Sequence, residues 1–136
     1  MPRTDPEHLA AEVLDLLTDE DDEELGLLER ACRSTDVPAL AEQHGLPDYW
    51  SSDMEDLCTV LQSWEERFGT RILALGQERL IVSVAAPASS MNEAEAIAAE
   101  HFAFSPDTIT QGDHETLRAY AAHDVLGKQM WSFWWD

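Results

Sequence analysis

Apolar residues recur three or four positions apart through the first half of the chain. This is the spacing of one face of an α-helix, and it predicts four helices in succession. Their ranges are 5–17, 25–34, 36–44 and 52–68. The last helix has the clearest boundaries: Ser52 and Glu55 form a capping box at its start, and Gly69 stands where a left-handed residue ends a helix.

The first predicted helix begins with Asp5 as its N-cap and Pro6 at the first helical position. Its apolar stripe consists of Leu9, Val13, Leu16 and Leu17. An acidic run over 19–24 then interrupts the pattern. The run lacks the glycine turn and the spaced ligands of a calcium loop, so we interpret it as a link between two helices.

From Thr70 the apolar pattern takes a period of two, which is typical of strands. Two β-rich runs, 71–75 and 80–84, flank a short turn that contains Gly76, and they predict a hairpin over 70–84. Residues 129–135 predict a further strand, whose side chains alternate between two faces. One face carries Trp131, Phe133 and Trp135, and the other carries Met130, Ser132 and Trp134.

Two helices and a short strand are predicted between the hairpin and the final strand. Ser90 and Glu93 form a capping box at the start of the first helix. The box is followed at helical spacing by Ala94, Ile97, Ala98, His101 and Phe102. Residues 108–111 are β-prone and predict a short edge strand. Asp113 can cap the second helix, which ends near Gly127.

This order of elements predicts an α+β fold. Its small, mainly antiparallel sheet combines the hairpin 70–84 with the C-terminal strand 129–135, and helices pack against it. The loop after His44 divides the chain into an acidic helical N-terminal region, 1–48, and an α+β core domain, 49–136.

The formal net charge of −20 is distributed unevenly. Residues 1–66 contain 19 acidic and 3 basic side chains, a balance of −16, whereas residues 67–136 contain 9 and 5, a balance of −4. Such a charge repels nucleic acid and anionic lipid, and it favours either a basic partner or simple solubility. Direct nucleic-acid binding is therefore not expected.

Membrane attachment is not expected either, because no apolar run reaches the length of a membrane span. The first residues lack the basic-then-apolar order of a signal peptide. Cys32 and Cys58 each fall on the apolar side of a predicted helix, as small core residues in a reducing compartment do. We expect a cytoplasmic protein.

Four motifs occur in a characteristic order: Ser63–Gly69, Ala98–Asp107, Leu117–Ala121 and Trp131–Asp136. Together they resemble the bacterial family catalogued as domain of unknown function 4253, over residues 55–136. That family has no established activity, so the resemblance implies no reaction or cofactor. Many members have a cysteine after Phe-Ala-Phe where this chain has Ser105, and thiol chemistry is not expected at this position.

Candidate catalytic chemistry centres on Glu100, His101 and Asp107, which bring two carboxylates and an imidazole to one helix end and its exit loop. A general acid–base pair or a divalent-metal site can be built from such groups. Alternatively, His101 lies at a helix–sheet seam with one nitrogen hydrogen-bonded, and Asp107 caps a turn. No metal or nucleophile motif accompanies these residues. We favour the structural role and predict no metal and no cofactor.

The final strand supplies the candidate binding residues, Trp134 and Asp136, which place a carboxylate beside an aromatic surface. An arginine can neutralise such a group and stack on the indole. Other polar residues that could contribute to a site are Asp113, His114 and His123.

Three functions are compatible with these features. The first is a non-enzymatic protein–protein interaction module, with an acidic inhibitor or immunity-type protein for a basic partner as its concrete form. The second is a small hydrolase or metal-dependent enzyme that uses Glu100, His101 and Asp107. The third is a DNA mimic. The sequence identifies neither the partner nor the oligomeric state.

Overall fold

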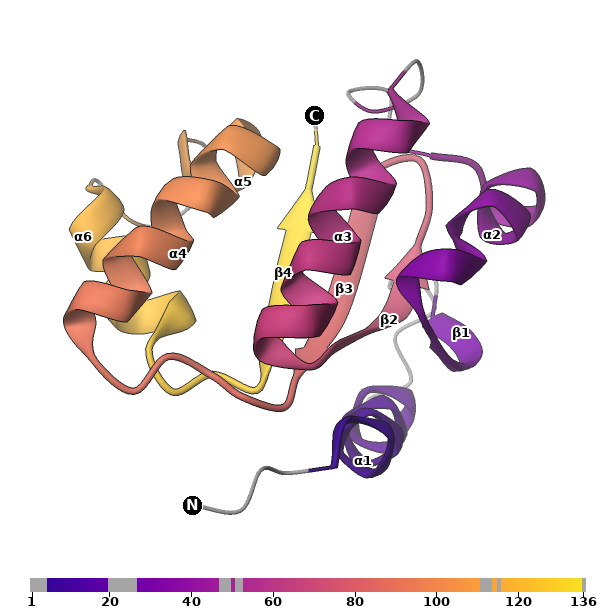
Figure 1. Cartoon of the computed structure of the whole chain (residues 1–136), viewed down its shortest axis with the longest axis horizontal. Coiled ribbons are helices and arrows are strands. Elements are labelled where there is room, and N and C mark those ends of the chain that lie inside the picture. The colour runs from indigo at the N-terminus through magenta and orange to yellow at the C-terminus, as the bar shows by residue number, and fades with distance from the viewer. Residues whose placement is uncertain are drawn as a thin grey trace.

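The computed structural model describes residues 5–19, 27–46, 50, 53–110, 114 and 116–135 of the chain (Figure 1). At its centre lies an antiparallel sheet. Its strands follow the order β1 (Leu27–Cys32), β2 (Thr70–Leu75), β3 (Arg79–Val84) and β4 (Met130–Trp134). Helices pack against the sheet, so the predicted α+β fold with a mainly antiparallel sheet is confirmed.

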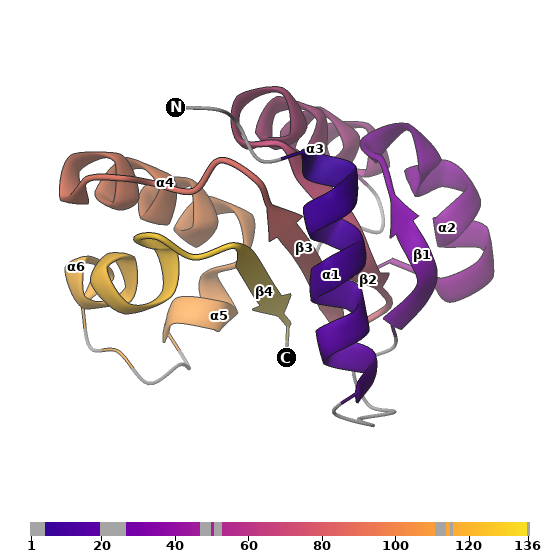
Figure 2. The ribbon, with the colours of Figure 1, turned by 90° about the horizontal axis from the view of Figure 1, so that it is seen from below.

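The two faces of the sheet are covered by different helices. Helix α3 (Met54–Phe68) crosses one face (Figure 1), and α1 (Pro6–Asp19) crosses the other (Figure 2). Helix α4 (Met91–Phe104) continues the layer of α3 past β4, and ring contacts such as Trp64–Phe104 join the two helices. Two hydrophobic cores result, one on each side of the sheet.

The hairpin β2–β3 and the final strand β4 occupy the predicted segments. Leu80 pairs with Phe133 and Val82 with Trp131, which fixes the register of β4. Its side chains alternate as predicted: Trp131, Phe133 and Trp135 are buried in the core beneath α3, whereas Ser132 on the opposite face is exposed. One face of β4 therefore contributes its side chains to the hydrophobic core beneath α3.

Residues 27–32 form strand β1, so the prediction of a helix over 25–34 is wrong. The spacing of Leu28 and Cys32 fits one turn of a helix, but a run of only six residues does not distinguish helix from strand. Antiparallel pairing of Leu27 with Ala74 decides the conformation. β1 is an edge strand of the same sheet, so described residues of the predicted N-terminal region join the core. The division at residue 48 stays a prediction.

Helix α1 begins at Pro6, where predicted, and Asp5 accepts a hydrogen bond from the backbone of Glu7 at 3.2 Å. One residue of its predicted stripe is wrong: Leu16 is 66% exposed. The buried positions are Leu9, Ala10, Leu14 and Leu17. These residues face the sheet at helical spacing, and Leu16 lies outside that arc.

Residues 106–110 form helix α5 (Pro106–Thr110), so the prediction of an edge strand over 108–111 is wrong for the residues that the structure describes. Pro106 opens the helix, a position in which its missing N–H costs nothing. Helix α6 (Leu117–Tyr120) follows and continues into a π-helical turn, η4 (Ala121–Val125). Thr116 caps α6, and the predicted cap, Asp113, lies outside the described residues.

Local signals placed the end of α3 and the start of α4 correctly. Gly69 ends α3 at φ 64°, and a Cβ there would meet the Cβ of Ala85 at 3.0 Å. The hydroxyl of Ser90 accepts a hydrogen bond from the backbone of Glu93, which starts α4. The short elements η2 (Ser34–Asp36) and α2 (Val37–His44) connect β1 to the segment before α3, and the predicted cap Ser52 lies outside the described residues.

No helix in the described part of the chain is both long enough and apolar enough to span a bilayer.

Candidate functional site

His101 lies at the centre of the aromatic core, which we define as Trp64, Phe104, Trp131 and Phe133. The imidazole is fully buried, and its ring centroid lies 4.6 Å from that of Trp131 and 4.8 Å from that of Phe133. Both neighbours meet it edge to face, which is a favourable aromatic geometry. His101 is therefore a packed core residue on the inner side of α4.

A single hydrogen bond fixes the His101 ring. Its Nδ1 lies 2.8 Å from the hydroxyl oxygen of Tyr120, whereas its Nε2 has no hydrogen-bond partner among the described residues. Burial lowers the pKa of His101 to about 3, because a charged imidazole loses its hydration there. Burial, and secondarily the charge of Asp124, raises the pKa of Tyr120. The pair is neutral and structural at neutral pH.

Glu100 is held by an ion pair with Arg67 on α3. Arg67 Nη1 donates to Glu100 Oε2 at 3.0 Å, and its second terminal nitrogen contacts Oε1. The indole N–H of Trp64 also donates to Oε1, at 3.3 Å. The hydrogen bond with Glu100 raises the pKa of Arg67. This carboxylate links α3 to α4 at the edge of the core.

Asp107 lies partly buried in the first turn of α5, between two residues that bind the final strand. The hydroxyls of Ser105 and Thr108 each lie 3.1 Å from the carbonyl oxygen of Trp134. The Trp134 N–H in turn donates to Thr108 Oγ1 at 3.0 Å. These two hydroxyls form hydrogen bonds with the backbone of Trp134 on the outer edge of β4, in place of the backbone groups of a further strand. The hydroxyl of Ser105 therefore has a structural use.

The three candidate catalytic residues do not share an open cleft. His101 is shielded from solvent, and Glu100 faces Arg67 instead of Asp107. Of the two candidate binding residues, Trp134 is half-buried, and Asp136 lies outside the described residues.

A cleft of about 380 Å³, which we call the β4 cleft, lies beside the outer edge of β4. Trp134, Tyr120 and Lys128 contribute to its walls. At its rim, His114 Nε2 lies 3.1 Å from Asp124 Oδ2, and the ring of His114 stacks on that of His123 at 5.2 Å. Sequence reasoning named both histidines and Trp134 but could not bring them together.

A larger hollow of about 680 Å³, the β1–α2 groove, lies between β1 and α2, which run side by side in Figure 2. Its walls include Leu27, Leu28 and Leu40, and its charged residues include Glu29 and Asp36. Sequence reasoning missed this groove because it treated 25–34 as a helix. The useful signal was the high acid content of the first 66 residues.

Ion pairs, each with one buried partner, connect the N-terminal elements to α3 and to β2. Glu65 on α3 is 9% exposed and accepts hydrogen bonds from Arg33 Nη2 at 3.0 Å and from the Ser34 backbone at 3.1 Å. Burial by itself would raise the pKa of Glu65, but these hydrogen bonds and the charges of Arg33 and Arg71 lower it. Arg71, 8% exposed, also pairs with Glu7 at 2.6 Å.

Within the described part of the chain, no group of three or more His, Cys, Asp or Glu side chains is arranged to hold a metal ion. The histidine and carboxylate residues near the β4 cleft form a pairwise contact instead.

A family model matches residues 25–136, which cover all four strands of the sheet. The match begins 30 residues before the segment that carried the resemblance, and it includes β1 and α2 but not α1. Searches among curated proteins and solved structures gave no match. The chain therefore belongs to the family described as Domain of unknown function (DUF4253).

Proposed function

We propose that the protein is a cytoplasmic, non-enzymatic interaction module whose partner is a basic protein. The observation that carries this proposal is the uneven distribution of charge along the chain. Residues 1–66 hold 16 of the 20 net negative charges, and their described parts form α1, β1, α2 and most of α3 on one side of the molecule (Figure 1). An inhibitor or immunity-type protein for a basic enzyme is the concrete form.

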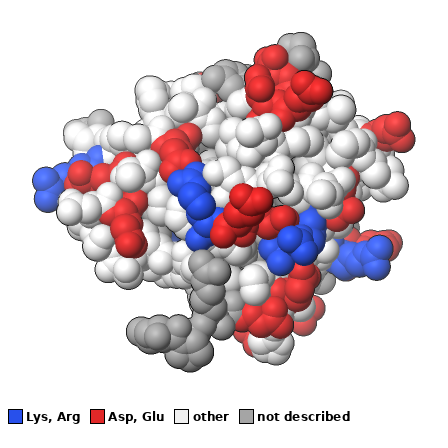
Figure 3. Space-filling model, viewed as in Figure 1, with Lys and Arg blue, Asp and Glu red and all other residues white. Residues whose placement is uncertain are grey.

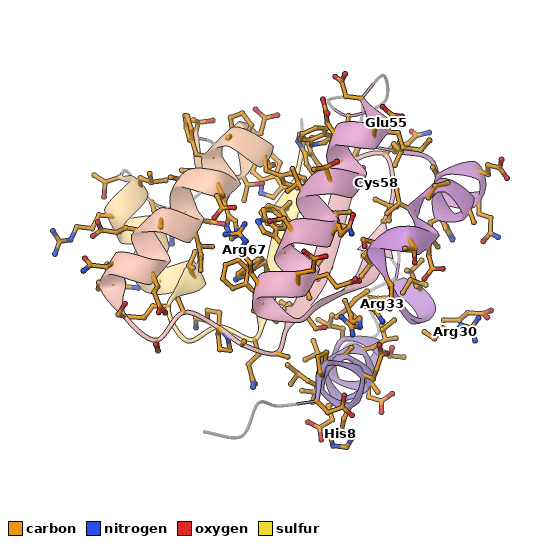
Figure 4. All side chains as sticks on the ribbon, viewed as in Figure 1. His8, Arg30, Arg33, Glu55, Cys58 and Arg67 are labelled. Carbon is orange, nitrogen blue, oxygen red and sulfur yellow. The ribbon has the colours of Figure 1, made fainter. Side chains whose placement is uncertain are left out.

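The distribution of acids favours a protein partner over the role of a DNA mimic. A mimic needs carboxylates spaced like phosphates along one face. On the face in Figure 3, acidic side chains lie in separate groups, with Lys or Arg side chains and uncharged surface between them. Glu55, at the start of α3, is one of the acidic residues on this face of the molecule (Figure 4). Such spaced charges suit a protein surface with matching cations.

The arrangement of the candidate catalytic residues also supports a binding role over an enzymatic one. A general base must reach the proton that it removes. His101 is enclosed by aromatic rings and its pKa is about 3, and Glu100 is paired with Arg67. These residues contribute to the packing of α4 on α3 and the sheet.

Affinity capture from the native cells, with the full-length chain as bait, tests the proposal. The captured protein is then purified, and its dissociation constant is measured at about 50 mM and about 300 mM salt, concentrations between which exposed charge pairs become screened. We expect a basic partner whose affinity falls at least tenfold, and loss of that partner's activity in the complex if the protein is an inhibitor. An affinity indifferent to salt would contradict a charge-led function.

A further inference from the structure

The β1–α2 groove contains more negative than positive charge. Glu29 and Asp36 line it together with one described cation, Arg30, and Glu7 also lines it but is paired with Arg71. Figure 4 shows Arg30 extending away from the ribbon into solvent. Among the ion pairs of the described residues, none joins Glu29 or Asp36 to a lysine or arginine. These two carboxylates are available to a cation from outside.

Strand β1 brings backbone groups to the same groove. It pairs with β2 at Leu27 and at Cys32, and the four residues between these pairs face Leu73 alone on β2. A bulge of this kind leaves N–H and C=O groups outside the regular ladder. An extended chain laid along β1 can hydrogen-bond such groups. Because bulged edges resist indiscriminate strand addition, side-chain contacts must supply part of the affinity.

The groove also has an apolar wall. Leu27 and Leu28 come from β1 and Leu40 from α2, and Ala31 and Ala39 also line the groove. Its volume of about 680 Å³ lies within the range of small-molecule binding pockets. A lysine or arginine can lay its aliphatic stem on such a wall and bring its charge to a nearby carboxylate.

We propose that the β1–α2 groove is the docking site for an extended segment of the partner that carries lysine or arginine side chains. This inference rests on the proposed function. The segment lies along the bulge of β1, and its cations pair with Glu29 and Asp36. Charge complementarity selects this occupant, because phosphate and anionic lipid are repelled by the same carboxylates.

The test uses the folded full-length protein and a fluorescent peptide of about eight residues, the length of a β-strand, in which valine alternates with lysine or arginine. Fluorescence anisotropy gives the dissociation constant. A peptide with glutamate in place of each cation is the first control, and we expect it not to bind. Hydrogen exchange of the complex should show new protection in residues 27–32 and 37–44.

The decisive variant is Glu29→Gln combined with Asp36→Asn, which keeps side-chain size and removes two charges. We expect it to weaken binding of the basic peptide at least tenfold. The matched control is Glu55→Gln combined with Asp56→Asn on α3, which removes the same charge from exposed positions outside the groove. We expect less than about a threefold change there, since exposed distant charges are screened.

Asp36 also accepts a hydrogen bond from the Arg33 backbone at 2.8 Å, so the double variant can lose stability. Glu29→Gln alone is the second variant, because Glu29 is exposed on β1. It should weaken binding at least threefold while the thermal melt stays unchanged. An unchanged dissociation constant for this variant would overturn the pairing with Glu29.

Equal weakening by the groove variant and by the α3 control overturns the groove as the docking site but leaves the acidic interaction function standing. New hydrogen-exchange protection along β4 instead of β1 would likewise overturn the groove as the docking site and leave the acidic interaction function standing. If the wild type binds no basic peptide while a basic partner is captured with salt-dependent affinity, the extended segment is the wrong occupant. If no salt-dependent partner exists, the proposed function itself fails.

Discussion

The two faces of the sheet are covered by different types of side chain. On the α3 side, Trp64, Trp131 and Phe133 interlock as rings, with the Trp64 and Phe133 centroids 5.5 Å apart and nearly parallel. On the α1 side, small and aliphatic side chains such as Ala10 and Leu14 pack on the strands. The aromatic face lies wholly within the segment that the family shares, whereas α1 precedes it.

The difference extends to the polar groups at each face. The aromatic face encloses a neutral pair, His101 and Tyr120. The α1 face is bounded by charges, where Arg71 pairs with Glu7. A dry aromatic core responds to lost volume and to buried protonation, whereas a partly exposed ion pair responds to salt. We infer that the aromatic face contributes most of the free energy of unfolding and that the packing of α1 on the sheet contributes less.

The largest effect is expected from Trp64→Ala. Trp64 is fully buried, and its removal leaves a cavity among four aromatic neighbours. Substitutions of this kind cost about 3–5 kcal/mol, a large part of the stability of a small domain. Urea unfolding followed by circular dichroism measures the loss. A loss below about 1 kcal/mol would show that the aromatic face is not the main core.

A smaller effect is expected from Leu14→Ala on α1. Leu14 is 7% exposed, and we expect a loss of about 2 kcal/mol, at the low end for a buried leucine. Hydrogen exchange should accelerate in α1 while β3 keeps its protection. Leu16→Ala is the matched control on the same helix, because Leu16 is 66% exposed, and its effect should stay within about 0.5 kcal/mol. Equal losses for both variants would contradict the orientation of α1.

Lowering the pH should destabilise the folded protein, because His101 is buried in its neutral form in the aromatic core. The folded pKa of about 3 lies below the ordinary value of 6.5, so the unfolded chain binds the proton first as the pH falls. The unfolding free energy should therefore drop by about 2 kcal/mol between pH 7.5 and pH 5 from this group. The measurement compares the pH dependence of the wild type with that of His101→Phe, in which this component should be absent. Parallel curves would argue against a buried neutral imidazole.

The smallest effect is expected from Glu7→Gln at the border of the α1 face. The Glu7 side chain is 56% exposed, so its pair with Arg71 is screened, and we expect a loss of about 0.5 kcal/mol. Thermal melts should show the difference between wild type and variant at low salt and its disappearance at about 1 M salt, where the screening length is about 3 Å. Asp15→Asn, an exposed change on the same helix, is the control. A larger loss that salt does not alter would place this pair in the core.

The sequence by itself determined the features that depend on a few adjacent residues. Gly69 ended α3 because a left-handed residue needs little more than the absence of a Cβ. Ser90 capped α4 through a hydrogen bond three residues away. The alternation of β4 was readable because a strand with one buried face repeats every two residues. The family resemblance followed from motifs within these elements.

Only the tertiary structure decided the features that depend on distant partners. Residues 27–32 became a strand because Ala74 and Ile72 lie beside them, and residues 106–110 became a helix whose Thr108 hydroxyl binds Trp134. The environment of His101 depends on rings from α3 and β4, which no local spacing reveals. The β1–α2 groove exists for the same reason: short segments have weak intrinsic preferences, and packing between elements far apart in sequence selects among them.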